Sequence, residues 1–226
     1  MAQLDNIRAC VFDAYGTLYD FNSATERCRD VLGDKADRLS AEWRAKQLQY
    51  TWLRSLMGLY APFWTVTGDA LDYSMDTMGI DDTALRDRLM GLYMNIDAFP
   101  EVTEVLGTLK GAGLKLAILS NGSPEMLEAA AKHTGCDALL EASLSVDELG
   151  VYKPDPRVYQ LAVDRLGVPA EAIAFQSSNA WDAVGAAAFG FRVVWINRYG
   201  QRRERLPAQP DAEVDSLRAL PGILGL

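Results

Sequence analysis

The chain of 226 residues carries a formal net charge of −9, and 49% of its residues are hydrophobic while 23% are charged. These fractions are typical of a globular protein and exclude an intrinsically disordered or collagen-like chain. The acidic balance argues against nucleic acid as a partner, because nucleic-acid sites are normally basic. The longest apolar runs, such as residues 193–196, have the length of a strand, so no membrane span is expected.

The N-terminal residues and the cysteines bear on location. Residues 1–8 lack the basic stretch and following apolar stretch of a secretory signal. The three cysteines, Cys10, Cys28 and Cys136, show neither metal-binding nor redox spacing, which suits a reducing compartment. We therefore expect a cytoplasmic protein, either an enzyme or a binding domain.

Strands and helices alternate along most of the chain. A short apolar strand is expected at residues 9–12, and from about residue 100 the alternation becomes regular. A helix with one apolar face begins near Val102, and residues 116–119 form the next buried strand. Further helices are expected from Pro124, from Pro156 and over 180–189, and further strands around 139–146, 172–175 and 192–196. This pattern is typical of a doubly wound parallel sheet, so we predict an α/β fold.

Residues 18–96 interrupt this alternation. They contain helical patterns without a convincing strand, and they hold Trp43, Trp52 and Trp64 together with five of the seven methionines. We predict an inserted helical subdomain, leaving residues 1–17 and 97–226 as the α/β core. Most of its large apolar residues are expected to form a small core, and some to line an apolar pocket. This composition would also suit a contact in a homodimer.

Polar side chains follow the predicted strands at the points where the strands end. The carboxyl ends of parallel strands share one edge of a sheet, where ligands commonly bind. The residues expected at this edge are Asp13, Ser120, Asn121, Lys153, Ser177, Ser178, Asn179 and Asp182. Each residue alone is weak evidence, because a serine or asparagine before a helix is more often a helix cap. Together they describe a carboxylate held ionised by a lysine and by hydrogen bonds, the setting in which an aspartate acts as a nucleophile.

Four segments resemble, in chain order, the four motifs of the haloacid dehalogenase superfamily. They are residues 13–18, 119–122, 153–156 and 177–182. The resemblance covers essentially the whole chain and implies a Rossmann-like core with a helical cap at residues 18–96. Most members are phosphatases, which need a second aspartate two residues after the nucleophile and further acidic residues that hold Mg²⁺. Here Tyr15 replaces that aspartate, and Ser177-Ser178-Asn179 replaces the leading acidic residue of the fourth motif.

These departures resemble the metal-independent (S)-2-haloacid dehalogenases. Their first motif reads Asp-Ala-Tyr-Gly-Thr, their third reads Lys-Pro-x-Pro-x-x-Tyr and is complete here with Tyr159, and their fourth reads Ser-x-Asn-x-x-Asp. The resemblance implies an enzyme that needs no metal or other cofactor. It implies hydrolytic dehalogenation of small (S)-2-haloalkanoic acids to (R)-2-hydroxy acids and halide, through an aspartyl ester on Asp13.

The resemblance also implies roles in the reaction. Asp13 attacks the carbon that bears the halogen, and Lys153 keeps it ionised. Asp182 and Asn179 then activate a water molecule that hydrolyses the ester, with Lys153 assisting. Thr17 is expected to orient the nucleophile. Tyr159 and Ser177 are expected to hold Lys153 in place.

Further residues are expected to bind the substrate. The resemblance assigns the leaving halide to Arg44 and Asn121, with an apolar wall that includes Phe63 and Trp181. Ser120, together with backbone N–H groups near Tyr15 and Asn121, offers a seat for the substrate carboxylate.

Two other functions stay open at this point. One is a phosphatase of the same superfamily acting on a small phosphate ester, and the other is a non-catalytic binding protein. A serine–histidine or cysteine–histidine mechanism is excluded by count, because the single histidine, His133, is expected at the surface near a helix C-terminus.

Overall fold

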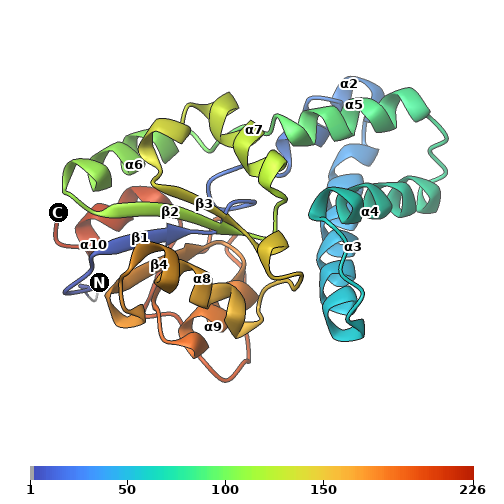
Figure 1. Cartoon of the computed structure of the whole chain (residues 1–226). Coiled ribbons are helices and arrows are strands. Elements are labelled where there is room, and N and C mark those ends of the chain that lie inside the picture. The colour runs from blue at the N-terminus through green and yellow to red at the C-terminus, as the bar shows by residue number, and fades with distance from the viewer. Residues whose placement is uncertain (1–2) are drawn as a thin grey trace.

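A six-stranded parallel sheet forms the centre of the molecule (Figure 1). The computed structural model describes residues 3–226. The sheet order is β3-β2-β1-β4-β5-β6. The strands are β1 (Ala9–Phe12), β2 (Lys115–Ser120), β3 (Ala142–Ser145), β4 (Ile173–Ser177), β5 (Arg192–Ile196) and β6 (Ala212–Val214). The predicted α/β class is confirmed, and β6 was not expected.

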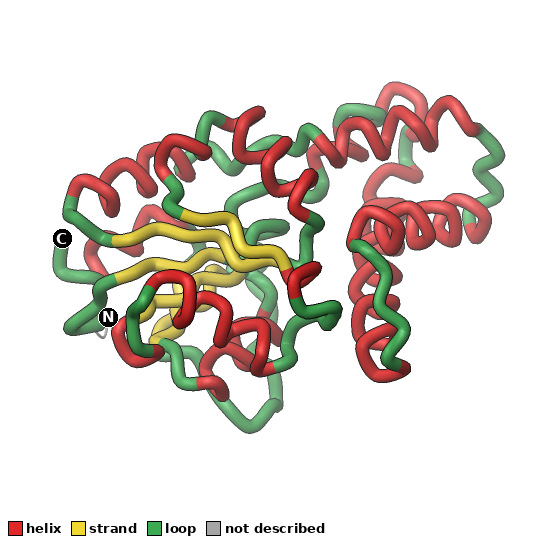
Figure 2. Tube along the Cα trace, viewed as in Figure 1, coloured by secondary structure: helices red, strands yellow, loops and turns green. Residues whose placement is uncertain are grey.

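Helices cover both faces of the sheet, which is why its central strands are buried and mostly apolar (Figure 2). One face carries α6 (Val102–Gly111), α7 (Pro124–Thr134) and the short α10 (Leu220–Ile223). The other carries α8 (Pro156–Leu166) and α9 (Ala180–Phe189). All four residues of β1 are buried. This arrangement leaves the edge at the carboxyl ends of the strands as the place where polar side chains gather.

A helical layer lies beyond that edge (Figure 1). It consists of α1 (Ser23–Glu26), α2 (Arg29–Leu32), α3 (Lys35–Met57), α4 (Phe63–Thr77) and α5 (Thr83–Met94). Helices α3 and α4 pack together, and the indole N–H of buried Trp43 donates to the Thr67 carbonyl at 2.8 Å. The expected helical character of this stretch is confirmed. The domain boundaries at 17/18 and 96/97 stay a prediction.

The two connections between the core and the helical layer run side by side. The amide of Phe99 donates to the Leu18 carbonyl at 2.9 Å, and that of Asp20 donates to the Asp97 carbonyl at 2.8 Å. Arg198, from the loop after β5, pairs with Glu101 at 2.6 Å and also donates to the Thr17 carbonyl at 2.8 Å. These contacts fix where the helical layer sits over the sheet edge.

None of the helices within residues 3–226 combines the length and the apolar character that crossing a bilayer requires.

Candidate active site

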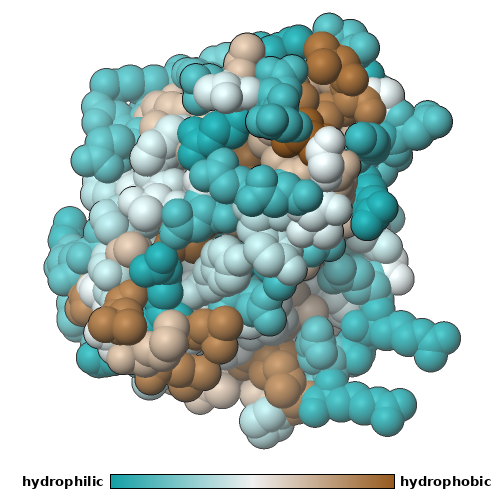
Figure 3. All heavy atoms as spheres, turned by 90° about the vertical axis from the view of Figure 1, so that its right-hand side faces the viewer, coloured by the Kyte–Doolittle hydropathy of each residue, from teal (hydrophilic) through white to brown (hydrophobic). Residues whose placement is uncertain are grey.

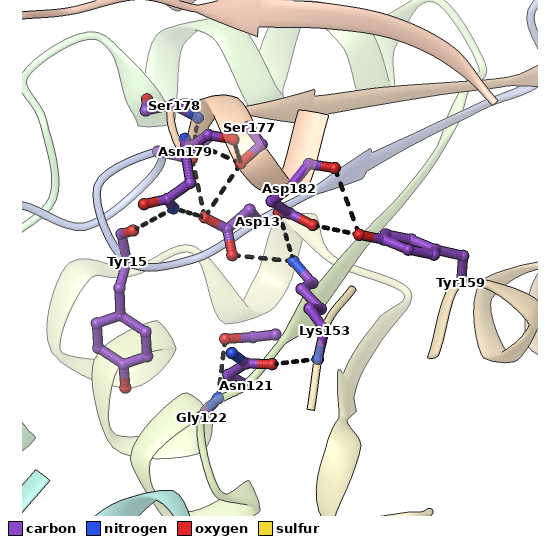
Figure 4. Close-up of polar contacts among 12 residues, drawn as sticks. Asp13, Tyr15, Asn121, Gly122, Lys153, Tyr159, Ser177, Ser178, Asn179 and Asp182 are labelled. Atoms are coloured by element: carbon purple, nitrogen blue, oxygen red, sulfur yellow. Dashed lines mark hydrogen bonds and ion pairs between the residues drawn. The ribbon is translucent and has the colours of Figure 1, made fainter. Parts of the chain in front are cut away.

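The pairing register of the sheet brings three strand ends together. Phe12 of β1 lies opposite Ile118 of β2 and Gln176 of β4. Asp13 follows β1 directly, and its amide donates to the Gln176 carbonyl at 2.9 Å. Asp13 is therefore level with Ser177, the last residue of β4 (Figure 4), and with Leu119, one residue before the end of β2 at Ser120.

A lysine ammonium lies between two buried carboxylates. Lys153 Nζ is 3.0 Å from Asp13 Oδ1 and 2.8 Å from Asp182 Oδ2 (Figure 4). The side chains of Lys153 and Asp182 are 1% and 0% exposed, so water screens these charges little. Because removing one partner of such a group would leave a buried charge uncompensated, the three side chains act as one unit.

This arrangement shifts the pKa values of Asp182 and Lys153. Burial raises the pKa of the Asp182 carboxyl, and the attraction of Lys153 only partly offsets that effect. Burial acts to lower the pKa of Lys153, but the charges of Asp13 and Asp182 outweigh it and raise that pKa above its ordinary value. The lysine is therefore a permanent cation at neutral pH, and Asp182 is a stronger base than an exposed aspartate.

The two oxygens of Asp13 have different surroundings. Oδ2 accepts from Asn179 Nδ2 at 2.8 Å, from Thr17 Oγ1 at 3.2 Å and from Ser177 Oγ at 3.5 Å. Oδ1 accepts only from Lys153 within the described residues. Thr17 itself is held by the Ser178 amide, which donates to its hydroxyl at 2.8 Å. The carboxylate is thus fixed through one oxygen, and the other keeps a lone pair free.

The loop after β2 borders the same space. Asn121 Oδ1 accepts from the Lys153 amide at 3.1 Å, and no acceptor for its Nδ2 lies within residues 3–226. Ser120 Oγ accepts from the Gly122 amide at 3.0 Å. A Cβ at Gly122 would lie 2.9 Å from the ring of Tyr15, so this close approach requires glycine. Asn121 and Ser120, which were expected to bind the halide and the substrate carboxylate, are thus held by hydrogen bonds to backbone amides of Lys153 and Gly122.

Arg44 of α3 reaches from the helical layer to the core. Its Nη2 donates to Asn179 Oδ1 at 3.1 Å and to the Tyr15 carbonyl at 3.3 Å. Arg44, Asn179 and Trp181 line a cleft of about 190 Å³ between the helical layer and the core. Phe63 is buried on another side, where its ring packs against Tyr15 at 5.8 Å between centroids. The structure therefore brings Trp181 and Arg44 to one cleft, with Phe63 behind the Tyr15 ring.

Tyr159 and Ser177 act on Lys153 indirectly. The Tyr159 hydroxyl donates to Asp182 Oδ1 at 2.8 Å, and the Ser177 hydroxyl donates to Asp13 Oδ2 at 3.5 Å. Both side chains therefore act on the carboxylates that flank the lysine. His133 lies exposed in the last turn of α7, 3.2 Å from Asp97, as expected for a surface residue.

The charged groups at this edge do not fit a divalent cation. Mg²⁺ takes near-octahedral oxygen ligands, among them one or two carboxylates. Here the Lys153 ammonium already bridges Asp13 and Asp182. In the described part of the chain, no three histidine, cysteine, aspartate or glutamate side chains come together in a group that could hold a metal ion. Asp13 and Asp182 are therefore already paired with a cation of the chain itself.

Comparison with known proteins identifies relatives over nearly the full chain. A family model of haloacid dehalogenase-like hydrolases matches residues 7–190. The (S)-2-haloacid dehalogenase 4A of Burkholderia cepacia is 50% identical over 96% of this chain and 94% of its own length. A crystal structure of a dehalogenase superimposes with a TM-score of 0.96 at 49% identity, covering 98% of this chain and 99% of that one.

A second solved structure shows a substrate-derived group. It is the L-2-haloacid dehalogenase of Xanthobacter autotrophicus with chloropropionic acid covalently bound, which superimposes with a TM-score of 0.90 at 36% identity and covers 97% of this chain and 98% of its own. The family match and the identity to these relatives agree with the motifs at the sheet edge. The chain belongs to the haloacid dehalogenase-like hydrolases and, within them, to the (S)-2-haloacid dehalogenases.

Proposed function

We propose that this chain hydrolyses (S)-2-haloalkanoic acids to (R)-2-hydroxy acids and halide, through an ester on Asp13 and without a metal ion. The observation that carries this proposal is the Asp13 carboxylate itself: Oδ2 is fixed by three donors, while Oδ1 faces only the Lys153 ammonium. Such a carboxylate is ionised and oriented without a general base. The curated relatives named for this activity support the same substrate class.

The first step is a displacement at carbon. Asp13 Oδ1 attacks the carbon that bears the halogen from the opposite side, so a C–O bond forms while the C–halogen bond breaks and the halide leaves with the electron pair. The configuration at that carbon inverts. Charge develops on the leaving halogen, and preorganised donors there lower the barrier. Arg44 and the free Nδ2 of Asn121 are the proposed donors.

The second step is hydrolysis of the ester. Water attacks Cγ of Asp13, and its proton passes to Asp182, whose raised pKa makes it the stronger base. Oδ2 becomes the oxyanion, and its donors Asn179, Thr17 and Ser177 are already in contact with it. When the intermediate collapses, Oδ1 leaves with the hydroxy acid and takes up a proton, and the water oxygen stays on Asp13.

The substrate carboxylate needs its own donors. Ser120 and the backbone N–H groups near Tyr15 and Asn121 lie at the same edge and are proposed for this contact. Trp181 and Phe63 are proposed as apolar surfaces near the substrate, Trp181 in the cleft with Arg44 and Phe63 behind the Tyr15 ring.

Mass spectrometry of Asp182→Asn tests the two-step scheme. Incubation with (S)-2-chloropropionate is expected to release chloride and leave the acyl ester on Asp13, because the base for the second step is missing. Asp164→Asn, an exposed aspartate on α8, serves as the matched control and should turn over without trapping an ester. An unmodified Asp13 in Asp182→Asn, beside an active wild type, would contradict the assigned roles.

The two alternative functions predict different results in the same assay. A phosphatase would cleave phosphate esters and lose activity on chelation of divalent metals. A non-catalytic binding protein would release no chloride at all. The bridging of Asp13 and Asp182 by Lys153 favours neither alternative.

Partners and location are also proposals. The small 2-haloalkanoate and the halide are the ligands, and a homodimer is proposed through the exposed apolar residues at the end of α3. The cytoplasmic location stays a prediction. The three cysteines on which it partly depends are buried and unpaired.

A further inference from the structure

Three polar side chains of the helical layer are buried together, and the proposed mechanism uses none of them. Gln47 of α3 is 1% exposed, Thr67 of α4 is 0% and Tyr93 of α5 is 3%. Gln47 Nε2 donates to Thr67 Oγ1 at 2.8 Å and to the Tyr93 hydroxyl at 3.2 Å. Buried polar groups are costly unless paired, and a fully paired group fixes one arrangement of its members. This cluster therefore holds Gln47 in one position.

The cluster also fixes which end of the Gln47 amide faces the active site. Thr67 donates its single hydroxyl proton to the Phe63 carbonyl at 2.7 Å, and a carbonyl can only accept. Toward Gln47 the hydroxyl can then only accept, so Nε2 must face Thr67. The opposite end, Oε1, consequently faces Arg44 and accepts from its Nη1 at 2.8 Å.

From Arg44 the hydrogen bonds continue to the nucleophile. Arg44 Nη2 donates to Asn179 Oδ1, and Asn179 Nδ2 donates to Asp13 Oδ2 at 2.8 Å. A guanidinium has five N–H donors in one plane, and Arg44 uses both terminal nitrogens in the contacts with Gln47, Asn179 and the Tyr15 carbonyl. Its other N–H groups have no acceptor among residues 3–226. Fixing both terminal nitrogens fixes the plane, and with it the direction of the unused donors.

We propose that Gln47 is a positioning residue that sets the orientation of the Arg44 guanidinium toward the leaving halide. The proposal rests on the proposed function, in which Arg44 stabilises the departing halide. Chloride is the poorer leaving group and needs more stabilisation than bromide as it departs. Loss of Gln47 should therefore slow the release of chloride more than the release of bromide.

The test compares Gln47→Met with Gln49→Met. Methionine keeps the length and volume of glutamine but offers Arg44 no comparable acceptor. Gln49 is exposed on the same helix and serves as the control. Single-turnover halide release is measured with (S)-2-chloropropionate and (S)-2-bromopropionate, and thermal melting checks folding. For Gln47→Met we expect chloride release to slow roughly 10–100-fold, because small displacements of catalytic groups carry such costs. Bromide release should slow less, and Gln49→Met should match the wild type.

An equal loss with both halogens would indicate a general structural defect and would overturn the proposal, as would unchanged chloride release. If Gln47→Met does not fold, Thr67→Val takes its place, because this substitution removes the acceptor that orients the Gln47 amide. A larger loss of chloride release than of bromide release in Thr67→Val supports the proposal, and wild-type rates overturn it.

A readout without turnover separates this inference from the proposed function. The side-chain ¹⁵N signals of Arg44, assigned with Arg44→Lys, should show hindered rotation of the guanidinium in the wild type and faster rotation in Gln47→Met. Identical signals in both proteins overturn the positioning role. Absence of halide release from the wild type would count against the proposed function alone.

Discussion

Lys153 carries one positive charge between two buried carboxylates, and this balance governs both stability and reactivity at the site. With Lys153 present, Asp13 and Asp182 coexist as close neighbours in a site that water reaches little. Without it, two negative charges would face each other in a medium of low dielectric constant. The same side chain therefore supports the fold and the ionised nucleophile.

Replacing Lys153 should be costly for folding. We expect Lys153→Met to lower the free energy of unfolding by about 3–5 kcal/mol, the range for removing one partner of a buried ion pair. Lys132→Met, which removes an exposed partner of Glu128, should change it by less than about 1 kcal/mol. Denaturant unfolding of the two variants measures the difference, and equal stabilities would contradict the role given to Lys153.

The raised pKa of Asp182 predicts the acid side of the pH profile. The base must be ionised, so ester hydrolysis should fall as pH drops through a pKa that burial holds above the ordinary value of 3.8. The Tyr159 hydroxyl lowers that pKa by donating to Asp182, so Tyr159→Phe should move the acid limb to higher pH. The decay rate of the ester, measured against pH in both proteins, checks the shift. A limb that moves to lower pH in the variant would contradict this account.

Residues at strand ends could be predicted from the sequence, whereas residues chosen by tertiary contacts could not. Asp13 and Asp182 follow the first and fourth predicted strands, and parallel pairing alone brings such positions together. The partner of Tyr159 depends on how α8 packs on α9, which no spacing reveals. Gln47 was missed because its only signal is its place three residues after Arg44 on one helix.

At the scale of elements, the strands were predictable because they are short apolar runs buried on both faces of the sheet. The helices between them were predictable because each has one apolar face that recurs with the period of a helix. The edge strand β6 was not, since it has three half-buried residues, Ala212–Val214, and no apolar run. Its pairing with β5 comes from the fold and leaves little trace in the local sequence.

One strand carries a polar residue that its surroundings do not satisfy. Gln176 of β4 is fully buried, and neither its amide nitrogen nor its oxygen has a hydrogen-bond partner within residues 3–226. We expect Gln176→Met to raise the free energy of unfolding by about 1–3 kcal/mol, because it removes a buried unpaired amide at nearly constant volume. Gln160→Met on the exposed face of α8 is the control and should change it by less than about 0.5 kcal/mol. A lower stability of Gln176→Met in denaturant unfolding would contradict this assignment.

At the scale of the whole molecule, the site depends on the helical layer lying over the sheet edge. Arg44 comes from α3, while the groups that it contacts come from the core. The inserted position of the helices could be read from the sequence, since a helical stretch follows the first strand directly. Their orientation could not, because it depends on the paired connections and on the Arg198–Glu101 contact.

The surface of the helical layer bears apolar patches among hydrophilic ones (Figure 3). Leu56 and Met57 at the end of α3 are 84% and 60% exposed, and Leu59 follows at 61%. Such a cluster favours association. We expect a mass twice that of the chain in sedimentation at micromolar concentration, and a shift to the monomer for Leu56→Glu but not for Leu206→Glu, a leucine exposed in another loop. A monomeric wild type would contradict the proposed homodimer.

The covalent role of Asp13 is tested most directly by one turnover in H₂¹⁸O with the enzyme in excess. The hydroxy acid should then carry ¹⁶O from Asp13, and the peptide containing Asp13 should gain ¹⁸O. Recovery of ¹⁸O in the hydroxy acid, with an unlabelled Asp13 peptide, would mean that water attacks the substrate carbon itself and would contradict the account.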